Sequence, residues 1–80
     1  MIINNMVTFF NIEQIIGHSG VYNEYHFWPG SYTDWEYTKT LVVDEEGNVW
    51  HDGDLYTDED IYMISDFQDN YGNYKYEKVA

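Results

Sequence analysis

Carboxylate side chains dominate the chemistry that this sequence offers. Fifteen Asp and Glu residues stand against three Lys and no Arg in 80 residues, giving a formal net charge of −12. Paired carboxylates perform general acid–base catalysis in glycosidases, where two acids stand roughly 5–9.5 Å apart across a sugar. Such a pair acts only in a pocket that separates the two pKa values, and a chain this acidic contains chance pairs at that spacing. We therefore expect a protein that is not an enzyme.

Calcium binding is the second chemistry that clustered carboxylates allow. Asp44, Glu46 and Asn48 occupy positions 1, 3 and 5 of an EF-hand-like loop. Position 6 is Val49 where such a loop needs Gly, and position 12 is Leu55 where it needs Glu. The three His residues are too scattered to form a ligand set, and the chain has no Cys. We expect weak, adventitious binding of divalent cations, but no dedicated metal site and no cofactor.

The acidic residues are concentrated in one part of the chain. Ten of the fifteen lie within residues 44–69, and no Lys lies between them. An ordinary surface mixes the two signs, because like charges repel and salt screens that repulsion only in part. The segment therefore predicts a surface for a cationic partner, whose Lys and Arg side chains would donate charge-assisted hydrogen bonds to the carboxylates.

Two tyrosines are expected beside these carboxylates. An aromatic ring next to an acid can hold an Arg guanidinium by a cation–π contact as well as by ion pairing, and Tyr is frequent in interface cores. The predicted partner-binding residues are Asp44, Glu45, Glu46, Asp52, Asp54, Tyr56, Asp58, Glu59, Tyr62, Asp66 and Asp69. A different interpretation stays open, in which the charge only keeps a Tyr- and Trp-rich small protein in solution.

The composition also excludes several classes of protein. Direct binding of DNA or RNA is not expected, because neutralising phosphates needs clustered cations and only Lys39, Lys75 and Lys78 are present. Without Cys there is no disulfide framework. The N-terminal residues lack the basic region of a signal peptide and are too polar for a membrane span. We expect a single domain over residues 1–80, soluble and cytoplasmic.

Strand-forming patterns fill most of the chain outside residues 58–71. Alternation of period two predicts a hairpin of residues 20–28 and 32–43, with the turn at Pro29-Gly30-Ser31. A second turn over 45–48 leads to a strand at Val49–His51, and Tyr74 to Val79 is a closing strand whose edge is free to pair with a second copy of the chain. Residues 2–10 fit a strand or a helix.

Residues 58–71 carry the pattern of the main helix. Thr57 is a suitable N-cap, acids fill the first turn, and Gly72 stands at the C′ position. A helical wheel places the apolar residues on the face opposite the carboxylates. The apolar set is Ile61, Met63, Ile64, Phe67 and Tyr71.

These elements predict an α+β fold. It consists of a small antiparallel sheet of three to five strands, on which the main C-terminal helix packs through Ile61, Ile64, Phe67 and Tyr71. The spacing of Asn11 and Gln14 adds a capped helical turn that ends at Gly17. The three Trp residues, Trp28, Trp35 and Trp50, are expected in the core.

The segment from Leu41 to Tyr71 resembles a known class of proteins. It combines a hairpin with an acidic turn (VVDEEGNVW) and a capped acidic helix (YTDEDIYMISDFQDNY). In charge, size and order of elements it is similar to the small acidic inhibitors that phages encode, the anti-CRISPR proteins and other DNA mimics. The resemblance implies a non-enzymatic protein whose carboxylates imitate a row of phosphates and occupy the nucleic-acid channel of a nuclease or CRISPR effector complex in the host cytoplasm. An immunity or antitoxin-like inhibitor of a basic toxin enzyme would use the same electrostatics.

Overall fold

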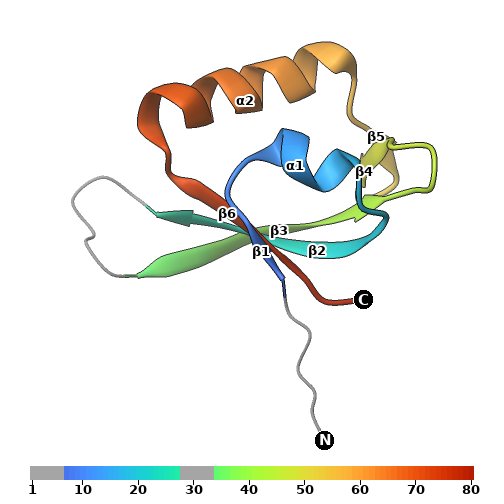
Figure 1. Ribbon diagram of the computed structural model, residues 1–80, viewed down its shortest axis with the longest axis horizontal. Helices are drawn as coiled ribbons and strands as arrows, with labels where there is room; N and C mark the ends of the chain where they lie inside the picture. Colours follow the sequence, from blue (N-terminus) through green and yellow to red (C-terminus); the bar gives the residue numbers. More distant parts are fainter. Residues whose placement is uncertain (1–6, 28–33) are drawn as a thin grey trace, which may run out of the picture.

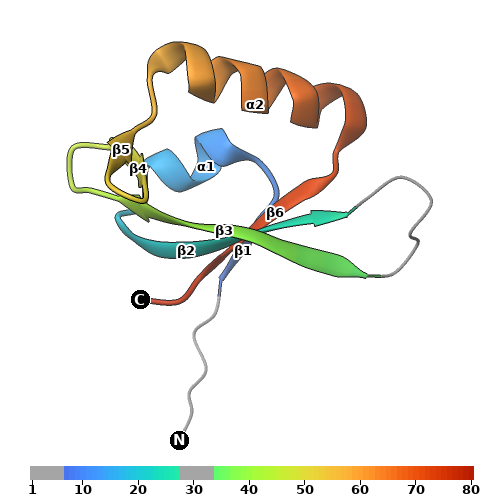
Figure 2. The ribbon, with the colours of Figure 1, turned by 180° about the vertical axis from the view of Figure 1, so that it is seen from behind.

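The computed structural model describes residues 7–27 and 34–80, which form a six-stranded antiparallel sheet with both helices on one face (Figures 1 and 2). The order of strands across the sheet is β1-β6-β2-β3-β4-β5. The fold is therefore α+β as predicted, with six strands instead of three to five, because two of them are only two residues long. The elements are β1 (Thr8–Phe9), α1 (Ile12–Ile16), β2 (Gly20–Phe27), β3 (Trp35–Val43), β4 (Val49–His51), β5 (Asp54–Leu55), α2 (Asp58–Tyr71) and β6 (Tyr74–Lys78).

The long hairpin of β2 and β3 forms the centre of the sheet, and the predicted alternation is confirmed there. Tyr22 pairs with Leu41, and the buried residues of β2 point toward the helices. The register shifts between Glu24 and Tyr25, which leaves Thr38 as an extra residue on β3. The turn predicted at residues 29–31, together with Trp28, lies outside the described residues, as does most of the segment 2–10.

The last strand lies inside the sheet, so the expectation that Tyr74 to Val79 form a free edge is wrong. β6 lies between β1 and β2, with Tyr76 opposite both Phe9 and Glu24. The two-residue strand β1 covers the side of β6 that the sequence pattern left free. Val7 extends this contact, since its carbonyl accepts a hydrogen bond of 3.0 Å from the Lys78 amide.

The core lies between the sheet and α1. It is formed by Ile12 and Ile15 of α1 and by buried residues of β2, β3, β4 and β6. Helix α1 lies between α2 and the sheet (Figure 1), so it is α1 that packs directly on the sheet, through Ile12 and Ile15. The predicted cap is confirmed, since Asn11 and Gln14 form a capping box. The buried sheet residues are Tyr22, Leu41, Val43, Val49 and Tyr76.

Helix α2 begins and ends where its caps predict. The Thr57 side chain accepts a hydrogen bond from the Asp60 amide, and Gly72 adopts the left-handed conformation at φ 62°. Ile61 and Ile64 pack against the core as expected. Phe67 is partly exposed but packs on the sheet as predicted, with its ring 6.1 Å from that of His26 and 5.6 Å from that of Tyr74. The predicted contact of Tyr71 with the core is wrong, because this side chain is 65% exposed.

The buried face of α2 is rotated by roughly 70° from the apolar face of the helical wheel. Its fully buried residues are Ser65 and Gln68. Gln68 accepts a hydrogen bond from the Ile12 amide (2.8 Å) and donates one to the Phe10 carbonyl (2.9 Å). Helix α2 therefore docks on α1 through polar contacts, and Met63, which is 62% exposed, lies outside the interface.

The two tryptophans that the structure describes are not core residues. Trp50 is 36% exposed and Trp35 is half-buried, and both lie on the face of the sheet opposite the helices. The expectation failed because strand alternation assigns Trp to one face of the sheet without saying whether a second layer covers that face. Neither helix in residues 7–27 and 34–80 is long and apolar enough to span a membrane.

Candidate partner-binding surface

The acidic segment starts with a turn that Asp44 organises. One carboxylate oxygen of Asp44 accepts hydrogen bonds from the Glu46 and Asn48 amides, both at 2.9 Å. The other accepts from Asn48 Nδ2 at 3.2 Å and from the Trp50 indole at 3.0 Å. The indole bond, followed by those from Asn48, lowers the pKa of Asp44. Asp44 thus shapes the turn that presents Glu45 and Glu46 to solvent.

A second turn presents two further predicted residues. Asp52 and Gly53 connect β4 and β5, with φ of 52° and 85°, as a two-residue hairpin loop requires. Asp52 and Asp54 are exposed, but they lie away from the other carboxylates of the candidate surface. Asp52 instead lines an open pocket of about 530 Å³ beside Tyr37 and Thr38 on β3. These two acids form a separate part of the surface.

One exposed side of α2 brings the remaining predicted acids together. Asp58, Glu59, Asp66 and Asp69 are all exposed and fall within roughly 100° of each other around the helix axis. Tyr62 stands among them and is 68% exposed. We call these five residues the acidic strip. Asp60 lies elsewhere, because its carboxylate accepts hydrogen bonds from the backbone amide and the hydroxyl of Thr57. These two bonds lower the pKa of Asp60, and the bond from the amide has the larger effect.

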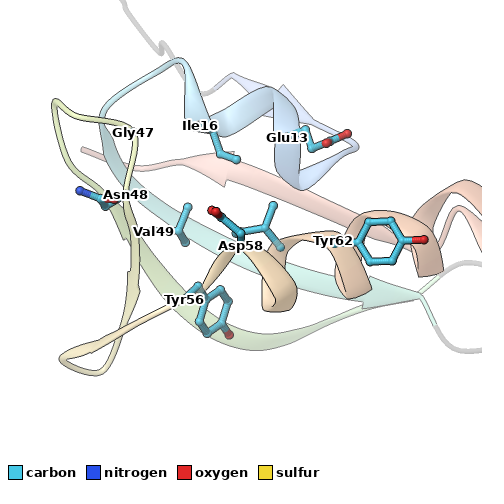
Figure 3. Close-up of a pocket in the computed structure, with 9 residues that line it drawn as sticks. Glu13, Ile16, Gly47, Asn48, Val49, Tyr56, Asp58 and Tyr62 are labelled. Atoms are coloured by element: carbon cyan, nitrogen blue, oxygen red, sulfur yellow. The ribbon is translucent and has the colours of Figure 1, made fainter.

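The acidic strip continues into a pocket of about 310 Å³ between α1, the β3–β4 turn and the start of α2 (Figure 3). The carboxylates in this pocket are those of Asp58 and Glu13, and Figure 3 shows Asp58 facing α1. Its apolar floor includes Val49 and Ile61. No Lys is among the described residues that line it. The pocket therefore offers two negative groups, an aromatic wall at Tyr62 and apolar surface for the stem of a long basic side chain.

Glu13 is a site residue that the sequence analysis missed. It lies in α1, far from residues 44–69, and reaches the pocket because α1 packs under α2. Its Oε1 accepts a hydrogen bond of 3.0 Å from Ser65 Oγ. The predicted helical turn placed an acid near the cap, but no local pattern relates that turn to α2.

Tyr56 is occupied by a cation of the chain itself. Lys39 Nζ donates a hydrogen bond of 2.9 Å to Tyr56 Oη and lies 5.6 Å from the centre of the ring. Burial opposes the charge of Lys39, but this hydrogen bond and the interactions with Tyr56, Glu24 and Tyr74 outweigh it and raise the pKa of Lys39. Tyr56 thus holds Lys39 below the surface, and Tyr62 is the tyrosine that faces solvent.

A second group of titratable residues lies under α2. Glu24 is 1% exposed and accepts a hydrogen bond of 2.8 Å from Thr38 Oγ1. Burial lowers the pKa of His26, an effect that Glu24 and Glu36 oppose, and the His26 ring packs 4.6 Å from that of Tyr74. Neither Glu24 nor His26 lines the two pockets described above.

Among the described residues, no three His, Asp or Glu side chains converge as a set of metal ligands. No family model, no curated protein and no solved structure matches the chain.

Proposed function

We propose that the protein is a non-enzymatic acidic inhibitor that binds the positively charged nucleic-acid-binding surface of another protein. Its partner is a nuclease or CRISPR effector complex, and the protein is a phage-encoded anti-CRISPR or a similar anti-defence protein. The observation that carries this proposal is the acidic strip of α2, which is exposed along its length, holds no basic residue and ends at a pocket with two carboxylates.

The spacing of the acidic strip supports nucleic-acid mimicry. With a rise of ~1.5 Å per residue, Asp58 and Asp69 lie ~16 Å apart along the helix axis, and four carboxylates occupy that length. One strand of duplex DNA places a phosphate every ~3.4 Å, so a strand segment of that length carries about five or six phosphates, and the strip sets two pairs of carboxylates toward its two ends, Asp58 with Glu59 and Asp66 with Asp69. A groove that holds a phosphate row with Lys and Arg can hold this strip with the same side chains.

The binding chemistry follows from the side chains of the strip and the pocket. Exposed carboxylates accept charge-assisted hydrogen bonds from guanidinium and ammonium groups, and Tyr62 offers its ring to an Arg. The negative field speeds association at low ionic strength and weakens as salt screens it. Inhibition results from occupation of the channel, and no bond in the partner needs to be broken.

Competition with nucleic acid tests the proposal. A panel of purified CRISPR effectors, each loaded with guide RNA, and of restriction nucleases is assayed for release of a fluorescent target duplex by the protein. We expect release from at least one member, with a dissociation constant that rises with salt. The triple variant Asp58→Lys, Glu59→Lys, Asp66→Lys should weaken binding by at least ~100-fold, since buried hot-spot positions each change affinity by ~30-fold or more.

A matched control removes negative charge elsewhere. Glu36→Lys on β3 changes one exposed acid and should leave affinity within about threefold, whereas Asp66→Lys alone should weaken it by ~10-fold or more. If the triple variant binds as well as the wild type with the same salt dependence, the charge only confers solubility and the proposal fails. If the protein binds a basic enzyme but does not compete with nucleic acid, it is an inhibitor of the immunity type.

A further inference from the structure

The face of the sheet opposite the helices, here called the open face, is uncovered by either helix (Figures 1 and 2). Strand register assigns its side chains, because residues paired across neighbouring strands point to the same side. Tyr25 pairs with Tyr37, Phe27 with Trp35, Val42 with Trp50, and Trp50 with Leu55. The open face is therefore rich in aromatic and aliphatic side chains.

The aromatic end of the open face is organised around one cation. The Tyr25 and Tyr37 rings meet edge to face at 5.9 Å, and Phe27 lies 5.3 Å from Trp35. Lys75 Nζ lies 5.2 Å from the centres of both the Tyr25 and the Trp35 rings. The rings are thus fixed relative to one another before any partner arrives, which lowers the entropy lost on binding.

Apolar side chains on this face remain accessible to solvent. Tyr37 is 55% exposed, Leu55 46% and Val42 43%, and Trp50 adds its own exposed surface. Since an aromatic side chain has ~150–250 Å² of surface, the exposed parts of these four side chains add up to something on the order of 350 Å². A standard interface buries ~800 Å² on each partner, so an interface of that size on this face also includes the half-buried rings of Tyr25, Phe27 and Trp35.

Charge is sparse on the open face, where Asp52 of the β4–β5 turn lines a pocket with Tyr37 and Val42. Among the described strand residues that point to this side, only Lys75 and Glu77 are charged, and their side chains pair at 3.7 Å. The acidic strip lies on α2, on the helix-covered side of the sheet. A basic partner is drawn to that strip, whereas the strand residues of the open face have no net charge to attract one.

We propose that the chain forms a symmetric dimer in which two copies pack their open faces together. A surface that is apolar, neutral and self-complementary in charge suits a second copy, since a two-fold axis brings the same patch to both sides. Sheets stack ~10 Å apart, and each α2 lies beyond its own sheet and α1, so the two acidic strips are at least ~30 Å apart. The Debye length is ~8 Å at physiological salt, so repulsion between the strips is screened.

Sedimentation velocity over a range of concentrations and salt tests the dimer. We expect a species of twice the 9.6 kDa chain mass, whose dissociation constant falls as salt rises, because salt screens the repulsion of two chains of charge −12. The double variant Tyr37→Lys, Val42→Lys should raise the dissociation constant by at least ~100-fold, since it buries like charges opposite each other. A monomer at every concentration up to ~100 μM overturns the proposal.

A matched control and a cross-link locate the interface. Met63→Lys changes an apolar residue of similar exposure on α2 and should leave the dimer intact. Since the chain has no Cys, a single Thr40→Cys substitution near the middle of the open face should form a disulfide-linked dimer in mild oxidant. If Tyr37→Lys alone, folded by circular dichroism, dimerises as well as the wild type, the open face is not the interface.

The dimer does not depend on the proposed inhibitor function, and salt separates the two. Binding of a basic partner weakens as salt rises, whereas dimerisation strengthens. If the protein dimerises but inhibits no nuclease, the dimer proposal stands and the proposed function fails. If it inhibits a nuclease as a monomer, only the dimer proposal fails.

Discussion

The contact between Gln68 and the start of α1 predicts a large loss of stability from one substitution. Gln68 is 5% exposed and joins the two helices through the Ile12 amide and the Phe10 carbonyl. In Gln68→Leu a side chain of similar size replaces it without either hydrogen bond. The Ile12 amide then has neither a protein partner nor access to water.

The magnitude follows from the burial of the two backbone groups. Leaving a buried donor unsatisfied costs ~1–3 kcal/mol, and losing the half-buried bond to Phe10 adds ~0.5–1.5 kcal/mol. We expect Gln68→Leu to lower the free energy of unfolding by ~2–4 kcal/mol. A chain of 80 residues has a total of only about 4–12 kcal/mol, so the variant loses a large part of its stability.

Urea denaturation measures this loss, and hydrogen exchange of the Ile12 amide locates it. Asn70→Leu on the exposed side of α2 is the control, and it should change stability by no more than ~0.5 kcal/mol. Gln68→Glu keeps the acceptor for Ile12 but sets a carboxylate against the Phe10 carbonyl. It should therefore be more stable below a pH of ~4.3, where a protonated Glu donates to Phe10, than at neutral pH. If Gln68→Leu matches the wild type within ~0.5 kcal/mol, the polar docking of α2 on α1 is refuted.

Three further predictions concern other described contacts. Asp44→Asn replaces one of the two acceptor oxygens with an NH2 donor, so the side chain can no longer accept from both the turn amides and the Trp50 indole, and the thermal midpoint should fall and the tryptophan emission shift. Because the pKa of Asp44 is lowered in the folded state, the stability that its carboxylate contributes is present above a pH of ~3.9 and is lost as pH falls further. Acid titration of the wild type against the variant measures this loss. Thr57→Ala removes the N-cap of α2 and should cost ~1 kcal/mol in urea denaturation, and an unchanged midpoint would contradict the capping box. Burial raises the pKa of Tyr76, and Glu24 adds to this effect. Tyr76 therefore ionises at lower pH in the unfolded chain than in the folded one, and stability should fall as pH rises above ~10. The absorbance of Tyr76 tyrosinate should appear only on unfolding.

Features that depend on neighbouring residues were predictable from the sequence. The bounds of α2 follow from Thr57 and Gly72, and the β2–β3 hairpin follows from alternation along each strand. Local capping and side-chain period act within a few residues, so the sequence carries them directly.

Features that depend on distant contacts were not predictable in this way. The helical wheel ranks Tyr71 as core by its apolar character, but Gln68 is buried instead because it satisfies backbone groups more than fifty residues away. Glu13 enters the candidate pocket for the same reason, through the packing of α1 on α2. The position of β6 inside the sheet likewise depends on Thr8 and Phe9, whose pairing leaves no local signature.

The place of β6 in the sheet has a consequence for how the chain folds. It is synthesised after every other strand, yet it lies second in the sheet and is the neighbour of β1. Until Tyr74–Lys78 emerge, Thr8 and Phe9 have no strand to pair with, and the outer side of β2 is an open edge. Contacts so far apart in sequence slow folding and expose strand edges to other chains meanwhile. Removal of β6 should therefore detach the N-terminal strand β1 as well, so that both ends of the chain leave the sheet together.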